Sequence, residues 1–272
     1  DRVNDAEMLS RMYETADALK RYEAAYPEGV GSEAYQQVQS FYDPVFRSYM
    51  ETYGYDDVYL ISLAGDIVYT VEHEADFATN LSSGRYSSTG LATAFRRARS
   101  GDVELTDFEP YAPSADAPAS FVAAPIELNG TLVGILAMQM PVDALNEVMQ
   151  SREGLGETGE TYLVGNDFLM RSDSRFAEES TLLVQKVKTD SVERALAGQT
   201  GVEVVEDHTG KSVWSAYAPL EVAEMDWAIL AEIDEAEVNQ PVVTLRNRAL
   251  MVGGVVLILL GVAGWLFSRW MV

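Results

Sequence analysis

The feature that most constrains this chain is an uncharged apolar run near its C-terminus, from Ala249 to Phe267. As an α-helix rising about 1.5 Å per residue, this run spans close to the roughly 30 Å hydrocarbon core of a membrane. A buried helix of similar length in a soluble protein would normally carry a polar face, which this run lacks. Trp265 and Trp270 lie toward one end, where amphipathic rings favour the membrane interface. We therefore expect residues 241–272 to form a transmembrane helix and its flanks.

The remainder of the chain carries a large excess of acidic side chains. The whole sequence has 43 Asp and Glu against 19 Lys and Arg, a formal net charge of −24. Three of the arginines flank the apolar run and no acid follows residue 240, so residues 1–240 alone carry −27. Such a surface repels nucleic acid and anionic lipid headgroups, so no nucleic-acid partner is expected. The excess fits either solubility in a salty habitat or a preference for cationic ligands.

The chain is poor in the side chains that most catalytic and metal centres use. It has no cysteine, which excludes a disulfide, a thiol nucleophile and a thiolate metal site. His73 and His208 are its two imidazoles, so neither a histidine-based metal site nor a catalytic triad is expected. The run from His73 to Asp76 is interpreted as a solvated charged loop, because adjacent side chains diverge. We expect no cofactor, no metal and no catalytic residue, and only carboxylate chemistry would support a membrane-anchored hydrolase instead.

Apolar residues at helical spacing predict two helices in the N-terminal region. The first covers residues 5–24 and is ended by Pro27 and the glycines that follow it. Ser32 is a typical N-cap for the second helix, which ends near Tyr53. We expect residues 1–56 to form a helical stalk. The apolar stripe of its entry helix is wider than one module can cover, so we expect a homodimer that forms through this helix.

From Val58 the apolar period changes from that of helices to that of strands. The stretch YLISLAGDIVYT, residues 59–70, predicts two strands joined by a Gly-Asp turn. A second hairpin is predicted around the Asn-Gly pair at 129–130, the strongest short hairpin signal. Short helices are expected at 91–99, opened by Ser88 or Thr89, and at 142–150. The pattern predicts an α+β fold with antiparallel sheets around short helices.

The same order of elements then occurs a second time. YLVGNDFLMRSD, residues 162–173, repeats the first hairpin at an offset of 103 residues, and an Ala-Pro pair late in a strand recurs at an offset of 94. A short helix at 191–197 and three strands between 201 and 233 complete the set. Matching elements in matching order indicate a tandem duplication. We therefore divide the chain into a helical stalk (1–56), a first module (57–152), a second module (153–240) and a transmembrane segment (241–272).

Two strings carry a resemblance to a known family. GLGETGETYLVGNDFLMRSDSRF, residues 154–176, resembles the opening of the membrane-proximal module of double Cache (dCache) sensor domains. TDFEPYAPSADAPASFVAAPI, residues 106–126, resembles the second half of their membrane-distal module. The resemblance implies two tandem PAS-like modules of a bacterial chemoreceptor, or of a related signalling protein, whose sensor lies outside the inner membrane. We further expect an earlier membrane segment before residue 1 and an output domain after residue 272.

The resemblance also implies a small-molecule pocket in the membrane-distal module. In the amino-acid-binding branch of the family, an Arg followed by Trp-Tyr holds the ligand carboxylate, and an Asp on the last strand holds the amine. Here SSGRYSS, residues 82–88, supplies the Arg and Tyr without the Trp, and Gln139 or Met140 stands near the aspartate position. Loops that lead into strands often carry binding residues, and aromatic side chains wall such pockets. The candidate ligand-binding residues are Arg85, Tyr86, Asp107, Tyr111, Ser114, Tyr69, Phe121 and Gln139.

These residues leave the ligand class open. Arg85 would meet a carboxylate, whereas Asp107 would favour an amine or a hydroxyl group. We therefore expect a small organic acid, an amine or another metabolite. A second pocket near Tyr162, Arg171 and Asp173 in the membrane-proximal module is the alternative.

The expected mechanism is a small movement rather than covalent chemistry. A ligand would close the distal module, move the proximal module and shift the helix that starts near Pro241. A difference in binding of about 1–3 kcal/mol between two states is enough to bias an output. Chemotaxis is the expected output, with a nucleotide cyclase, a diguanylate cyclase or a histidine kinase as alternatives.

Overall fold

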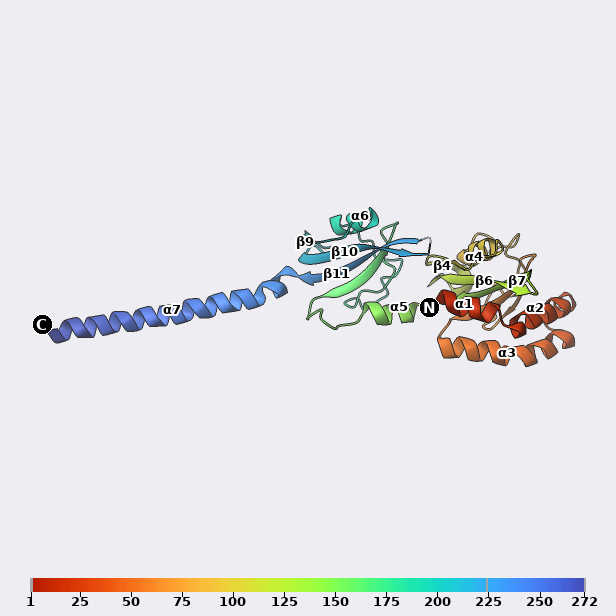
Figure 1. The fold of residues 1–272 in the computed structure, drawn as a ribbon, viewed down its shortest axis with the longest axis horizontal. Helices are drawn as coiled ribbons and strands as arrows, with labels where there is room; N and C mark the ends of the chain where they lie inside the picture. The colour runs from red at the N-terminus through yellow and green to blue at the C-terminus, as the bar shows by residue number, and fades with distance from the viewer. Residues whose placement is uncertain (1, 224, 272) are drawn as a thin grey trace.

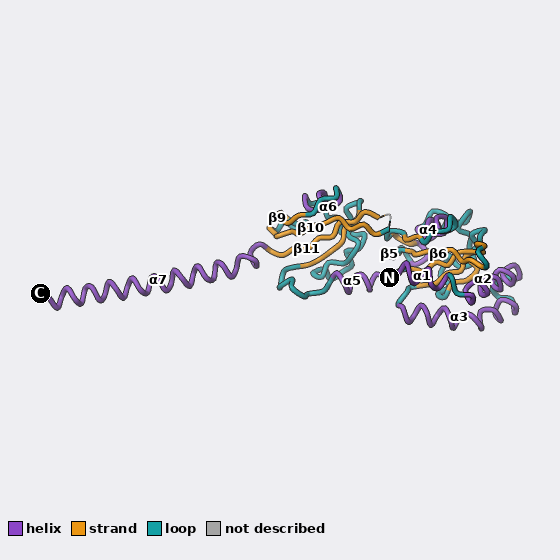
Figure 2. Tube along the Cα trace, viewed as in Figure 1, coloured by secondary structure: helices purple, strands orange, loops and turns teal. Residues whose placement is uncertain are grey.

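The computed structural model describes residues 2–223 and 225–271 of the chain. These residues form an elongated molecule with two modules in line and a long C-terminal helix that points away from them (Figure 1). We call the module farther from this helix distal and the nearer one proximal. Figure 2 shows the strands gathered in two separate groups, one in each module.

The N-terminal region consists of three helices that belong to the distal end of the molecule. They are α1 (Arg2–Ser10), α2 (Tyr13–Ala25) and α3 (Glu33–Tyr53), with the short 3₁₀ turn η1 (Tyr26–Glu28) before α3. The single helix predicted at 5–24 is therefore wrong, because the chain breaks between α1 and α2 and the Thr15 hydroxyl donates to the carbonyl of Leu9 at 2.7 Å. Ser32 caps α3 as predicted, accepting a hydrogen bond from the Tyr35 amide at 3.1 Å.

The distal module is built on a five-stranded antiparallel sheet in the order β2-β1-β7-β6-β3. Its strands are β1 (Asp57–Ser62), β2 (Ile67–Thr70), β3 (Glu104–Leu105), β6 (Phe121–Leu128) and β7 (Thr131–Gln139). Asn129 and Gly130 join β6 to β7, both with the positive φ that a tight hairpin turn requires. Both hairpins predicted for this module are confirmed.

The two faces of the distal sheet are covered differently. Helices α1, α2 and α3 lie against one face, and α4 (Gly90–Ala98) lies on the opposite face (Figure 1). Thr89 caps α4, accepting from the Ala92 amide at 3.3 Å. A small hairpin of β4 (Glu109–Tyr111) and β5 (Ala117–Ala119), joined through η2 (Ala112–Ser114), lies beside this sheet. We call the side under α1, α2 and α3 the helix face and the side under α4 the site face.

The proximal module repeats this plan with fewer strands. After α5 (Val142–Met149), a four-stranded antiparallel sheet runs in the order β8-β11-β10-β9. Its strands are β8 (Glu160–Gly165), β9 (Gly201–Glu206), β10 (Ser212–Val222) and β11 (Met225–Asp234), and α6 (Asp190–Leu196) packs against it. The hairpin predicted at residues 162–173 has one regular strand, because the residues after Gly165 make only isolated bridges such as Val164 to Met170.

The C-terminal helix α7 (Glu235–Met271) starts six residues before the predicted 241. Pro241 lies inside it, where a proline removes one hydrogen bond, here the one to the Glu237 carbonyl. The side chain of Glu237 supports this first turn by accepting from the amides of Glu157 at 2.9 Å and Thr158 at 2.8 Å. The helix is long and apolar enough to cross a membrane, by length and composition. The α+β fold with helical N-terminus, tandem modules and apolar C-terminal helix is confirmed.

Candidate ligand-binding site in the distal module

The central strands of the distal sheet present a polar and aromatic set on the site face. The register places Gln139 of β7 directly between Asp57 of β1 and Phe121 of β6. Because side chains alternate along a strand, Tyr59 shares the face of Asp57. The Tyr59 hydroxyl donates to Oε1 of Gln139 at 3.3 Å. These four side chains form the floor of the candidate site.

Two loops bring further polar groups over this floor. The loop after β2 carries Glu74 and Asp76, and the β4–β5 hairpin carries Tyr111 and Ser114. The Tyr111 hydroxyl donates to Oδ2 of Asp76. The Ser114 hydroxyl donates to Oε2 of Glu74 at 2.5 Å. The two loops are thus joined to each other through carboxylates that accept from hydroxyl groups.

Aromatic rings fill the space between the floor and the loops. The ring centroid of Phe121 lies 4.8 Å from that of Tyr111 and 6.2 Å from that of Tyr59, both in edge-to-face geometry. Tyr86, from the loop before α4, belongs to the same buried cluster. These buried rings give an apolar wall, and the hydroxyl groups of Tyr59 and Tyr111 bond to polar groups of the site, which suits a small amphipathic ligand.

Two carboxylates of the site are buried with one oxygen unsatisfied. Asp76 is fully buried, and its Oδ1 has no hydrogen-bond partner. Asp57 is 1% exposed; its Oδ1 accepts from the amides of Val58, Val71 and Glu72, whereas its Oδ2 has no partner. Within the described ranges, no lysine or arginine forms an ion pair with either carboxylate. Buried acids are normally paired, so this arrangement is unusual.

The protonation behaviour of these acids reflects their burial. Burial raises the pKa of Asp57 to about 7, against the lowering effect of its amide hydrogen bonds. Burial, with smaller contributions from Asp143 and Glu74, raises the pKa of Asp56 to about 6. Burial also raises the pKa of Asp76, although its bond from Tyr111 acts in the opposite direction. A cation placed among these groups would favour their ionised forms and lower these pKa values.

The loops over the site hold unusual backbone conformations. His73 and Ala78, on either side of Asp76, have φ of 54° and 58°, and Ala115 and Asp116 next to Ser114 have φ of 56° and 61°. Left-handed backbone at residues other than glycine costs of order 1 kcal/mol and gathers at functional loops. The strain therefore lies in the two segments that carry the polar groups of the site.

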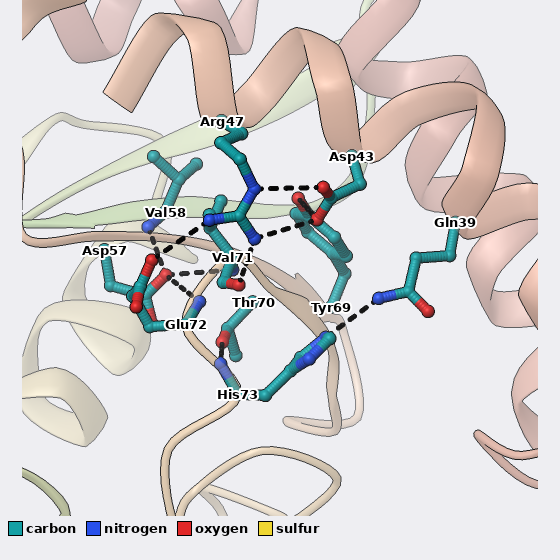
Figure 3. Close-up of polar contacts among 10 residues, drawn as sticks. All are labelled: Gln39, Asp43, Arg47, Asp57, Val58, Tyr69, Thr70, Val71, Glu72 and His73. Atoms are coloured by element: carbon teal, nitrogen blue, oxygen red, sulfur yellow. Dashed lines mark hydrogen bonds and ion pairs between the residues drawn. The ribbon is translucent and has the colours of Figure 1, made fainter. Parts of the chain in front are cut away.

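The loop with Glu74 and Asp76 is fastened to helix α3. Figure 3 shows Arg47 of α3 between Asp43 and the end of β2, where it donates to the carbonyl of Val71 at 2.9 Å and pairs with Glu72 at 3.3 Å. Gln39, one helical turn before Asp43, lies 3.2 Å from His73 between the side-chain nitrogens (Figure 3). Movement of this loop would therefore act on α3.

Most of the predicted binding residues meet in this site. The structure brings together Tyr86, Tyr111, Ser114, Phe121 and Gln139. Arg85 is exposed and lies with its guanidinium carbon 4.6 Å from the centre of the Tyr86 ring. Arg85 therefore stands at the outer edge of the cluster rather than among its polar groups.

Two of the predicted binding residues lie elsewhere. Tyr69 is on the helix face, because a bulge between Leu60 and Ile61 shifts its register; it stacks on Tyr22 at 4.7 Å and donates to Asp43 at 3.1 Å. The structure therefore places Tyr69 on the opposite side of the sheet from the other predicted binding residues.

Asp107 connects the two modules instead of facing the site. Arg171 of the proximal module donates from Nε and Nη2 to the two oxygens of Asp107 at 2.8 and 3.0 Å. The same guanidinium also pairs with Asp167 at 3.0 Å. The structure therefore places Asp107 in a bidentate ion pair between the modules, and does not bring it together with the other predicted binding residues.

Sequence reasoning missed the two acids that define the site. The interpretation of residues 73–76 as a solvated charged loop is wrong for Asp76, whose burial depends on the distant Tyr111. The position of Asp57, in contrast, could have been predicted from the local sequence. It lies two residues before Tyr59 at the start of a wholly buried strand, so period-two alternation puts both on one face.

Comparisons with known proteins agree with this architecture. The family model of the Cache domain (dCache_1) matches residues 2–242. The sensor domain of the V. cholerae histidine kinase DctB is similar to this chain with a TM-score of 0.54 and 13% identity, over 84% of this chain and 86% of that one. No curated protein sequence matches the chain.

A chemoreceptor domain is similar to the same extent. The ligand-binding domain of the Pseudomonas aeruginosa PAO1 amino acid chemoreceptor PctB has a TM-score of 0.51 and 15% identity in its complex with L-Arg, over 86% of this chain and 94% of that one. Its complex with L-Gln has a TM-score of 0.52 and 16% identity, over 90% of each chain. At identities this low, the structural similarity establishes a shared fold and nothing further. Because the family model covers nearly all of the chain before the apolar part of α7, the chain belongs to the dCache_1 family of Cache domains.

Proposed function

We propose that this chain is the extracytoplasmic sensor region of a transmembrane signalling protein, and that its distal module binds a small molecule with a positively charged group. The observation that carries the proposal is the pair of buried carboxylates, Asp57 and Asp76, each with an oxygen that has no partner. Asp76 accepts from the Tyr111 hydroxyl, and Asp57 shares a face of β1 with Tyr59.

The energetics of these acids favour a cation over an anion. An ionised carboxylate buried without a partner is costly, and an ammonium group bound beside it would offset that cost. Aromatic rings add a favourable interaction of about 0.5–2 kcal/mol with a cation over their faces. An organic acid would meet the acids without a basic partner among the described inner residues, since Arg85 stands at the outer edge. The PctB structures hold L-Arg and L-Gln, and both amino acids carry an ammonium group.

The route of the signal follows from the contacts around the site. Ligand contact with the loop after β2 would act on α3 through Arg47 and Gln39, and on the proximal module through the Arg171–Asp107 pair. The exposed apolar side chains of α2 and α3, such as Tyr13 and Phe41, would then serve in a homodimer. Helix α7 would carry the movement through the bacterial inner membrane.

The output class is proposed as chemotaxis, and the chain itself is proposed to have no catalytic activity. The fold is shared with the sensor domain of a histidine kinase as well as with a chemoreceptor domain, so a kinase output is the second candidate. Both outputs need the same event in this chain, a ligand-dependent shift between two conformations.

Thermal unfolding of the full chain in lipid nanodiscs tests the ligand class. We expect at least one of three probes with a positively charged nitrogen (putrescine, L-Gln and choline) to raise Tm, and succinate to have no effect. The Asp76→Asn variant should lose the shift, because the buried negative charge is removed while the shape is kept. Asp102→Asn, at an exposed position of the same module, is the matched control and should retain it.

Two outcomes would contradict the proposed ligand class or the proposed site. Stabilisation by succinate but by none of the amines, with loss of that effect in Arg85→Ala, would show that the site selects carboxylates. A shift that is the same in wild type and in Asp76→Asn would show that the amine binds elsewhere.

A further inference from the structure

The proximal module has a counterpart of the distal floor with different chemistry. The distal pair is Tyr59 and Gln139, joined by a hydrogen bond. In the proximal module, Tyr162 and Glu232 occupy the equivalent positions on the first and last strands, 103 and 93 residues later. The Tyr162 hydroxyl donates to Oε2 of Glu232 at 2.9 Å. The two modules thus share the tyrosine and differ at its partner, which is a neutral amide in the distal module and a carboxylate in the proximal one.

A histidine and a second carboxylate stand next to this glutamate. Asp207 and His208 begin the turn between β9 and β10. One potential ligand atom from each of Asp207, His208 and Glu232 lies within 4.8 Å of the other two. The Asp207 carboxylate is held in place by the amides of Thr209 and Lys211, both at 2.8 Å from its Oδ1. The three side chains come from two elements and are brought together by the sheet.

Unsatisfied atoms are the second, independent sign of a ligand. Glu232 is only 4% exposed, and its Oε1 has no hydrogen-bond partner. The buried Nδ1 of His208 also has none. Ser215 is on the strand position opposite Glu232, and its buried hydroxyl also has no hydrogen-bond partner. Burial raises the pKa of Glu232.

We propose that His208, Glu232 and Asp207 form a binding site for a divalent transition-metal ion of the zinc type. One imidazole nitrogen with two carboxylate oxygens is a donor set that zinc accepts, whereas calcium and magnesium prefer oxygen ligands alone. Three protein ligands leave a fourth position for water. Donor atoms around an ion at roughly 2.1 Å are at most about 4.2 Å apart, which is close to the limit of 4.8 Å within which these three atoms lie.

Access and charge both fit a cation at this position. Asp207 and His208 line a surface cavity of about 460 Å³ that also borders the start of α6. The acidic surface of the chain, with a net charge of −24, attracts cations into such an opening. This site is separate from the distal ligand site, and the inference does not depend on the proposed amine ligand.

Titration calorimetry of the full chain in nanodiscs with Zn²⁺ alone tests the inference. We expect one saturable site. His208→Ala and Glu232→Gln should each lower its affinity for Zn²⁺ at least about tenfold, because loss of a residue that only supports a metal ligand already lowers affinity by that much. Glu232→Gln keeps the shape of the side chain and its bond from Tyr162. The chain has two histidines, so His73→Ala is the matched control and should bind within about twofold of wild type.

Cobalt gives a second readout that surface binding would not produce. Co²⁺ in the site should show visible ligand-field absorption that Zn²⁺ displaces and that His208→Ala abolishes. Absence of saturable Zn²⁺ binding would overturn the inference. So would binding that survives both His208→Ala and Glu232→Gln, or that His73→Ala weakens to the same degree.

Discussion

Replacement of Asp57 by asparagine should make the distal module more stable at neutral pH. The pKa of Asp57 rises from its ordinary value of 3.8 in the unfolded chain to about 7 in the folded state, chiefly through burial. That difference corresponds to about 4 kcal/mol between the two protonation states. The folded form therefore binds the proton more tightly than the unfolded form does.

The sign of the pH dependence follows from linkage. Below pH 3.8 the carboxyl is protonated in both states, and its favourable contribution to folding is fully present. As pH rises toward 7, the unfolded chain has already lost the proton while the folded chain holds it, so stability falls. Above pH 7 up to about 4 kcal/mol has been lost. The amide side chain of the Asp57→Asn variant would be neutral throughout, and it would keep an oxygen to accept from the amides of Val58, Val71 and Glu72.

Urea unfolding at several pH values between 4 and 8 measures this effect. Far-UV circular dichroism follows the whole chain, whereas tryptophan fluorescence follows the proximal module and α7, because all four tryptophans lie outside the distal module. The free energy of unfolding of Asp57→Asn minus that of wild type should grow from pH 4 to pH 7 and then level off. Any constant cost of the new amide group shifts this curve without changing its slope.

Other buried acids do not disturb the comparison. Asp56 and Asp76 titrate in both proteins, so their contributions cancel in the difference. Asp102→Asn, an exposed control, should give a difference that is flat with pH. Curves for wild type and Asp57→Asn that run parallel from pH 4 to pH 8 would refute the claim that burial of this carboxyl destabilises the module.

Three further changes test the contacts between the parts of the molecule. Arg171→Gln, at a side chain only 5% exposed, should lower the free energy of unfolding of the proximal module by about 2 kcal/mol, because charged hydrogen bonds are lost. Arg152→Gln, at an exposed position, is the control and should change this free energy little. Equal effects of the two substitutions in urea unfolding would contradict the role of the intermodule pair. Gly134→Ala would drive a methyl group into the side chain of Leu19 on α2 and should cost about 1–3 kcal/mol by thermal unfolding, whereas Gly31→Ala, with open space around it, should not. Glu237→Ala should speed hydrogen exchange at the two amides it binds without affecting those of β11, and unchanged exchange there would disprove the link.

Local signals in the sequence were sufficient for most of the fold. Ser32 and Thr89 cap their helices, and the Asn129–Gly130 turn fixes a hairpin, because each acts through residues only a few positions away. The two modules were visible for a similar reason, since a duplication repeats local patterns in order. Pro241 misled the prediction of where α7 starts, because the contact that supports the turn before it comes from a loop some 80 residues earlier.

The site was less predictable because its chemistry depends on long-range contacts. Asp107 looked like a ligand group until Arg171, 64 residues later, was placed against it. Tyr69 changed faces through a bulge that the alternation of apolar residues does not reveal. His208 looked isolated because it lies in a turn and Glu232 comes from strand β11, 24 residues later. Burial of a charged side chain is decided by what the fold places above it, and the sequence pattern around it carries little trace of that.

The Glu237 contact determines where this Cache domain can be joined to a foreign helix in a chimeric protein. The structural unit that senses does not end with strand β11, because two backbone amides at the start of the proximal module rely on a carboxylate in the first turn of α7. A Cβ at Gly156 would collide with that carboxylate, so the loop and the helix are matched to each other. A fusion made directly after Asp234 would separate them, because a foreign helix would lack the carboxylate that binds the two amides. A fusion made after Glu237 would keep this contact in the chimeric protein.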